Sequence, residues 1–298
     1  MATITGDLGP GLAWSTDGPS RGASRRDTTI NVTFLTGGPM SQLVHTRQHG
    51  RVLVVRLNRP AARNALSLEL ALSLAGAFAS VPSSTGAIAL LADGDHFCVG
   101  GDVRAMAAAD EPAAFVHELA DNFHGVIRAV ATAVPVVCGV QGWAAGAGLS
   151  LALATDVVIA ADDASFQPAY PAIGATPDGG LTWTLPRAIG ERRARSLLLR
   201  NAVVSAADAL TLGLIDRVVP RAELEPAVLA EAAELAGGAR QALLGTKRLL
   251  SASASAQLTD QLDAEAISIA EHIGSPEGRE GVAAFIGRRR PEFTTAGG

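Results

Sequence analysis

A long stretch without a charged side chain, residues 129–155, constrains the fold of this chain more than any other feature. It exceeds the about 20 apolar residues that a membrane-spanning helix requires. However, it contains Pro135, Gln141 and repeated glycines, which would interrupt such a helix. We therefore predict a buried strand (PVVCGVQG, 135–142), a glycine turn and a core helix (GLSLALATD, 148–156), and no membrane span.

Segments with strand-like and helical spacing alternate on both sides of this stretch. We expect strands at 51–58, 86–93 and 214–220, a pair of short strands within 157–166, and helices at 67–81, 115–132, 193–201 and 205–213. Strands that alternate with helices predict an α/β fold. After Leu224 nearly the whole chain has helical spacing.

Three regions follow from these patterns. Residues 1–42 are rich in Gly, Ser and Thr without periodicity, so we predict a disordered N-terminal extension. Residues 43–236 form the predicted α/β core with the functional site. Residues 237–298 form a predicted helical region, and its apolar stripes require it to pack on the core or on another subunit.

Composition excludes several classes of protein. The net charge of -5 provides no basic face for nucleic acid. The two cysteines, Cys98 and Cys138, lie in apolar stretches and give no disulfide framework, and no Cys/His cluster has metal-ligand spacing. The N-terminus has no apolar signal core. We therefore predict a cytoplasmic protein that binds no metal.

Two glycine turns, in HFCVGGDVRAM and GWAAGAGLSLA, each precede a predicted helix. The first N–H groups of a helix have no intrahelical acceptor and lie at its positive end, so they suit a developing negative charge. One N–H from each turn would make an oxyanion hole. The same glycines also permit tight turns and close packing, so neither turn alone identifies a site. Neither turn matches the dinucleotide-binding fingerprint.

The order of several motifs along residues 45–295 resembles that of the enoyl-CoA hydratase/isomerase, or crotonase, family. The motifs are RPAARNAL, HFCVGGDV, GWAAGAGLSLALATD, ASFQPAYPAIGATPDGG, SAADALTLGLIDRVV and AAFIGRRRPEF. The resemblance implies a crotonase-like spiral of ββα repeats, a homotrimer or hexamer, and a role in fatty acid metabolism. It also implies an acyl-CoA thioester as substrate and no separate cofactor, since coenzyme A is part of that substrate.

The resemblance assigns candidate roles to individual residues. It implies that the N–H groups of Gly101 and Ala147 form the oxyanion hole for the thioester carbonyl, and that RPAARNAL lines the CoA nucleotide. The predicted substrate-binding residues are Arg63, Ala65, Asp102, Val103, Arg104, Ser150 and Tyr170. Lys247 and Arg288–Arg290 either contact CoA phosphates or form a solvated surface.

This sequence departs from the hydratases at two positions. Hydratases carry two glutamates that hold and activate a water molecule, and here Ser150 and Tyr170 stand at those positions. Neither side chain is a general base at neutral pH without a partner. Ser150 is alternatively a small filler, and Tyr170 a wall of the acyl site.

Asp178 is the remaining candidate acid. The segment PDGGLTW resembles isomerases of phenylacetyl-CoA epoxide breakdown, which keep a carboxylate here. Chlorobenzoyl-CoA dehalogenases use such an aspartate as a nucleophile with a histidine base, but Phe123 stands at the histidine position. His124 is one residue away, which turns it about 100° around the helix. Asp178 is alternatively only the N-cap of the helix that follows.

The predicted function is therefore double-bond isomerisation of an acyl-CoA through an enolate, with Asp178 as the single acid/base. Alternatives are a weak enoyl-CoA hydratase, a non-catalytic acyl-CoA-binding protein, and a dehalogenase or thioesterase with Asp178 as nucleophile.

Overall fold

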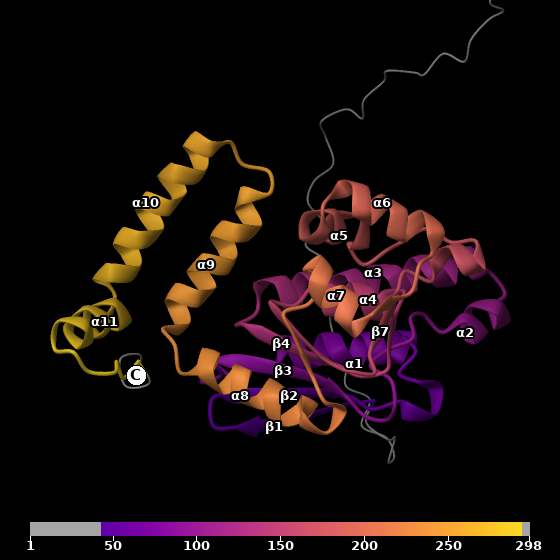
Figure 1. Cartoon of the computed structure of the whole chain (residues 1–298), viewed down its shortest axis with the longest axis horizontal. Helices are drawn as coiled ribbons and strands as arrows, with labels where there is room; N and C mark the ends of the chain where they lie inside the picture. Colours follow the sequence, from indigo (N-terminus) through magenta and orange to yellow (C-terminus); the bar gives the residue numbers. More distant parts are fainter. Residues whose placement is uncertain (1–42, 294–298) are drawn as a thin grey trace, which may run out of the picture. The chain divides into compact units, whose positions relative to one another are not determined.

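The computed structural model describes residues 43–293. The predicted N-terminal extension, residues 1–42, lies outside the described residues. Residues 43–293 form two mixed β-sheets and a series of helices (Figure 1).

The larger sheet has six strands in the order β1-β2-β3-β4-β6-β9. Their bounds are β1 Val44–His49, β2 Val52–Leu57, β3 Ala87–Ala92, β4 Val136–Val140, β6 Val157–Ala161 and β9 Arg217–Val219. Only the β1–β2 pair is antiparallel, and the other pairs are parallel. Every residue of β3 and β4 is buried, as expected for interior parallel strands that are covered on both faces.

Helices cover the two faces of this sheet. On one face, Val52 and Val54 pack in a cluster with Val228 of α8 (Leu224–Ala236), which lies along the sheet (Figure 1). On the other face, Leu53 and Val55 share a larger cluster with α1 (Leu68–Ala79) and α3 (Pro112–Thr132). Successive strand side chains point to opposite faces, so the uninterrupted apolar strands supply both clusters.

The smaller sheet joins β5 (Trp143–Ala145), β7 (Ser165–Gln167) and β8 (Val204–Ser205). The two short strands predicted within 157–166 are observed as β6 and β7, but the prediction that they pair with each other was wrong. β6 pairs with β4 and β9 in the larger sheet, whereas β7 pairs with β5 and β8. The turn at 162–164 carries the chain from one sheet to the other instead of folding it back on itself.

The uncharged stretch forms β4, β5 and α4 (Ala147–Leu153), which confirms the predicted strand, turn and core helix and adds a short strand within the turn. Within residues 43–293, no helix is long and apolar enough to cross a membrane. The predicted helices are observed as α1, α3, α6 (Glu191–Arg200) and α7 (Ala206–Leu212). Two more helices are present. α2 (Val103–Ala108) follows the glycine turn at Gly100–Gly101, and α5 (Leu181–Ile189) follows the segment that contains Asp178.

The C-terminal region is helical, as predicted. It contains α9 (Arg240–Ser253), α10 (Leu258–Gly274) and α11 (Pro276–Ile286). α9 contacts α3 of the core, and α10 contacts both α9 and α11 (Figure 1). Large apolar side chains stay exposed on these helices, among them Leu258, Ile269 and Phe285.

Candidate active site

The two glycine turns, far apart in the sequence, lie against each other. Cys98 N donates to Trp143 O at 3.0 Å, and Ala145 N donates to Cys98 O at 2.9 Å, so the two segments run side by side. A Cβ on Gly146 would lie 3.4 Å from the Cα of Gly100. A Cβ on Gly100 would lie 3.1 Å from the Ala145 carbonyl oxygen, and both glycines have positive φ, so glycine suits both positions. The contact brings the chain before α2 next to the start of α4.

The backbone around each turn leaves N–H groups without a backbone acceptor in the described part of the chain, among them those of Gly101 and Ala147. Leu66 N donates to Gly100 O at 2.7 Å, and Asp102 N donates to Leu66 O at 3.0 Å. Because backbone groups alternate in direction along an extended chain, the Gly101 N–H points away from Leu66. Ala147 is the first residue of α4, so its N–H has no intrahelical acceptor. Within residues 43–293, no backbone acceptor pairs with either N–H.

Gly148 makes this arrangement possible at α4. A Cβ at this position would overlap the carbonyl oxygen of Cys98. Burial raises the pKa of the Cys98 thiol to about 11, so this cysteine remains an uncharged packing residue beside the turn.

A cluster of hydrogen-bonded side chains follows the turns. Ser150 is fully buried on α4, and its Oγ lies 3.1 Å from the Tyr170 hydroxyl. The Tyr170 hydroxyl donates to Asp178 Oδ1 at 2.6 Å. Burial raises the pKa of Tyr170, and the neighbouring Asp178 carboxylate raises it further, so Tyr170 remains a protonated donor. The structure thus brings together three predicted site residues from α4, from η2 (Tyr170–Ile173) and from the loop before α5.

Asp178 does not cap α5. The N-cap residue is Gly180, and no side chain caps this helix. The interpretation of Asp178 as only an N-cap was therefore wrong, because two glycines separate it from the first helical residue. Within the described residues, the hydrogen bond from Tyr170 is the only one to the Asp178 carboxylate, so Oδ2 has no partner.

His124 and Phe123 of α3 both contact the loop that carries Asp178. His124 Nε2 accepts a hydrogen bond from Gly179 N at 3.1 Å. Phe123 is fully buried, and a Cβ on Gly179 would overlap its ring. This role of His124 was not predicted, because the turn of about 100° on the helix relative to Phe123 suggested that His124 points away from the site.

Arg59 and Asn64, for which no role was predicted, hold the segment that is predicted to line the CoA nucleotide. Arg63 is exposed, with φ +52°, and Ala65 is buried. Arg59 donates to the carbonyl of Ala65 at 2.8 Å, and the fully buried Asn64 donates to two backbone carbonyls of the β3 loop. The motif RPAARNAL therefore contains both exposed positions and structural anchors.

Asp102, Val103 and Arg104 have different surroundings. Asp102 Oδ1 accepts from Ala105 N at 3.1 Å and caps α2, while Oδ2 accepts from Arg59 at 2.8 Å. Burial opposes ionisation of Asp102, but the Arg59 and backbone hydrogen bonds outweigh it and lower its pKa. Val103 and Arg104 are exposed. Asp102 thus braces the glycine turn, whereas its two neighbours face outward.

Lys247 is paired within the chain and does not belong to a solvated surface. Its Nζ lies 2.6 Å from Asp156 Oδ2 and 3.2 Å from the carbonyl of Val130, so it ties α9 to the core. The interpretation of Lys247 as part of a solvated surface was therefore wrong, since its side chain is only 12% exposed, whereas its contact with CoA phosphates stays a prediction. Of the C-terminal arginines, Arg289 pairs with Glu280 at 2.6 Å.

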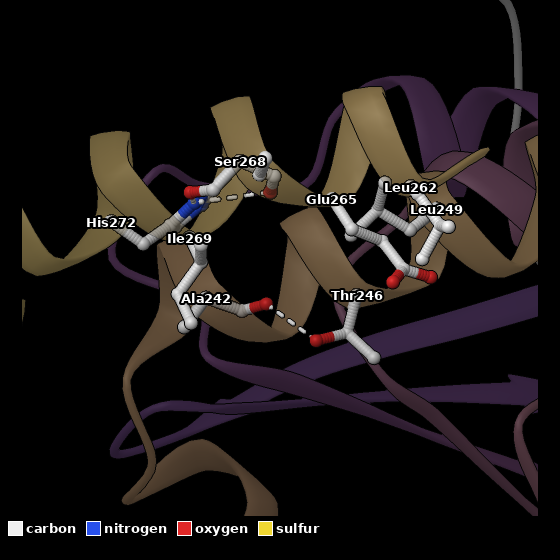
Figure 2. Close-up of a pocket in the computed structure, with 9 residues that line it drawn as sticks. Ala242, Thr246, Leu249, Leu262, Glu265, Ser268, Ile269 and His272 are labelled. Carbon is white, nitrogen blue, oxygen red and sulfur yellow. Dashed lines mark hydrogen bonds between the residues drawn. The ribbon is translucent and has the colours of Figure 1, made fainter. Parts of the chain in front are cut away.

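A groove between α9 and α10 lies apart from the predicted site residues. Figure 2 shows its lining, which includes Leu249, Leu262, Ile269 and His272. The ring of His272 hydrogen-bonds to the backbone of Ser268 and Gln241, so its nitrogens are engaged within the helical region. Within residues 43–293, no group of acidic, histidine or cysteine side chains is arranged to hold a metal ion.

Residues 47–296 match the family model described as enoyl-CoA hydratase/isomerase. The chain belongs to this family. It is 38% identical to a probable enoyl-CoA hydratase of Rhodobacter capsulatus, over 81% of this chain and 93% of that protein. It is 33% identical to the 1,2-epoxyphenylacetyl-CoA isomerase of Escherichia coli, over 86% and 99%.

Solved structures agree with the sequence matches. The crystal structure of an enoyl-CoA hydratase from Polaromonas superposes with a TM-score of 0.80 at 32% identity, over 83% of this chain and 98% of that chain. The predicted α/β crotonase fold is confirmed. As a member of the enoyl-CoA hydratase/isomerase family, the protein is an enzyme that acts on an acyl-CoA, and the family typically needs no cofactor.

Proposed function

We propose that this enzyme moves a double bond within an acyl-CoA thioester, with Asp178 as the single general acid/base. The observation that carries the proposal is the hydrogen bond from Tyr170 to Asp178 Oδ1. Among the described residues, Asp178 is the one carboxylate that hydrogen-bonds to this cluster.

The proposed reaction needs one base and one oxyanion site. Asp178 removes a proton from a carbon conjugated to the thioester carbonyl, and the electron pair moves onto the carbonyl oxygen to give an enolate. The N–H groups of Gly101 and Ala147 stabilise that oxygen, and each such donor is worth about 3 kcal/mol in comparable sites. Asp178 then returns the proton to a different carbon, so the double bond moves and no atom is gained or lost.

Hydration is the second candidate, and the name of the R. capsulatus relative favours it. Hydration adds a water molecule across the double bond. It needs groups that position the water and that deliver a hydroxyl group to one carbon and a proton to the other. In this chain Ser150 and Tyr170 hydrogen-bond to each other and to the Asp178 residue, so only one carboxylate serves the cluster. This supports a one-base shuttle over hydration.

A nucleophilic role for Asp178 is weaker still. A dehalogenase or thioesterase of this kind needs a base to activate water against the acyl intermediate. His124 Nε2 accepts the Gly179 N–H, so its basic nitrogen is already engaged. A non-catalytic acyl-CoA-binding protein would keep the two N–H groups and need none of these side chains.

Deuterium exchange separates these functions. The protein is incubated with enoyl-CoA and arylacetyl-CoA thioesters in heavy water, and deuterium uptake is followed by mass spectrometry. We expect uptake into an isomerised product, and Asp178→Asn to lower its rate by about 10²- to 10⁴-fold, because general acid/base groups contribute that much. Glu234→Gln, at an exposed acid on α8, is the matched control and should exchange normally.

The other outcomes identify the alternatives. A mass gain of one water would indicate a hydratase, and a covalent acyl adduct on Asp178 a nucleophile. Tight thioester binding without exchange would leave only an acyl-CoA-binding protein, and normal exchange by Asp178→Asn would remove Asp178 from the mechanism.

Three further assignments belong to this proposal. We place the core boundary at residues 43–236 and assign 237–298 to subunit packing in a trimer or hexamer. The exposed Leu258, Phe285 and Ile286 support this, since large exposed apolar surfaces mark interfaces.

Two free, buried cysteines support a cytoplasmic location.

A further inference from the structure

We propose that His124 and Ser150 form a clamp on the peptide group between Asp178 and Gly179, and that this clamp aims the Asp178 carboxylate. The inference rests on the proposed function of Asp178. It makes His124 and Ser150 positioning residues, which act on the reaction through Asp178.

The two contacts reach opposite ends of one peptide group. Ser150 Oγ donates to the carbonyl oxygen of Asp178 at 3.0 Å. His124 Nε2 accepts from Gly179 N at 3.1 Å. The Asp178 carbonyl and the Gly179 N–H belong to the same planar unit, so the two side chains hold that plane from both sides.

The proton inventory of the cluster is consistent with this clamp. Tyr170 uses its only proton on Asp178 Oδ1. Ser150 therefore shares its one proton among three acceptors, which are the Asp178 carbonyl at 3.0 Å, the Tyr170 oxygen at 3.1 Å and Gly146 O at 3.3 Å. His124 must leave Nε2 unprotonated to accept from Gly179, so its neutral tautomer carries the proton on Nδ1.

The loop needs such an anchor. Residues 171–176 before Asp178 are exposed, and Gly179 and Gly180 after it have positive φ angles of +60° and +80°. Glycine has more accessible backbone conformations than any other residue, so this segment does not fix its own direction. Holding the 178–179 plane fixes ψ of Asp178. The Tyr170 hydroxyl then fixes the carboxylate itself.

Four variants test the clamp. His124→Leu removes the acceptor while keeping bulk, and His124→Gln places an amide oxygen near the position of Nε2. Ser150→Ala removes the donor at the other end. The matched control is His117→Gln, because His117 lies on the same helix, is exposed, and pairs with the exposed Asp121.

We expect kcat for deuterium exchange to fall by about 10- to 100-fold in His124→Leu, because a small misplacement of a catalytic group costs that much. KM of His124→Leu should change little, since His124 is not among the predicted substrate-binding residues. His124→Gln should recover most of the rate, and His117→Gln should match the wild type. The double variant His124→Leu/Ser150→Ala should lose less kcat than the product of the two single losses, since both side chains act on one peptide group.

The results separate the clamp from the proposed function. If Asp178→Asn still exchanges deuterium normally, the assignment of Asp178 fails and the clamp has no catalytic meaning. If Asp178→Asn is inactive but His124→Leu keeps kcat within about twofold of wild type, the clamp alone is wrong. A parallel fall in kcat and in the urea midpoint, without rescue by His124→Gln, would also overturn it, because that pattern reflects general loss of folding.

Discussion

The two halves of the proposed site are made from different parts of the chain. The half that faces the thioester oxygen consists of backbone N–H groups at Gly101 and Ala147, held by the packing of two glycine turns. The half that moves the proton consists of side chains, Asp178 with Tyr170 and the two clamp residues. Substitution can remove the second half one function at a time, whereas the first half is lost only when the backbone moves.

A Cβ at Gly148 should produce the largest effect, because it moves the backbone half. In Gly148→Ala the new methyl group would overlap the Cys98 carbonyl, which neither α4 nor the turn can avoid. We expect a loss of about 3 kcal/mol in the free energy of unfolding, the upper range for overpacking, together with loss of exchange activity. Urea unfolding and the exchange assay measure both.

Gly76→Ala is the matched control for this variant. Gly76 lies within α1, and a Cβ there meets nothing within 4 Å. Alanine should stabilise that helix by about 0.5–1 kcal/mol and leave exchange unchanged. Equal stability for the two variants would mean that the turns do not depend on their close contact.

Tyr170→Phe should act on the side-chain half and leave the backbone half intact. It removes the donor to Asp178 Oδ1 but keeps the ring, which packs against the core. A carboxylate that is no longer aimed loses rate, so we expect exchange to fall by roughly 10- to 100-fold. Losing a hydrogen bond to a charged group should also lower the free energy of unfolding, by up to about 3 kcal/mol. Measured thioester affinity should stay near that of the wild type. A large loss of affinity would instead make Tyr170 a wall of the acyl site.

Sequence patterns predicted the backbone half more completely than the side-chain half. The uncharged stretch and its glycines predicted β4, the turn and α4, because apolar residues indicate burial and glycines indicate close packing. The Ser150 and Tyr170 departures pointed to Asp178 through a family resemblance. The contact of His124 with Gly179 could not be read in this way, because it depends on how the loop crosses α3. The same limit applies to β6 and β7, whose partners lie in different sheets.

Asp102 should give the smallest effect, because its carboxylate braces the backbone half from outside. It caps α2 and pairs with Arg59 at 2.8 Å, and these contacts lower its pKa in the folded protein. Asp102→Asn keeps a capping oxygen and loses the ion pair, so we expect a loss of about 1 kcal/mol at pH 7. Asp102→Ala loses the cap as well and should cost about 1 kcal/mol more.

The pH dependence of this loss tests its electrostatic origin. A carboxyl group whose pKa is lowered by folding stabilises the protein above its unfolded pKa of about 3.9, and this contribution disappears as the pH falls through the folded pKa. The difference in unfolding free energy between wild type and Asp102→Asn should therefore be constant near neutrality and shrink below about pH 4. Asp110→Asn, at an exposed acid beyond α2, should show no such difference. A difference for Asp102→Asn that persists into acid would mean that shape, and not charge, holds the Gly101 turn.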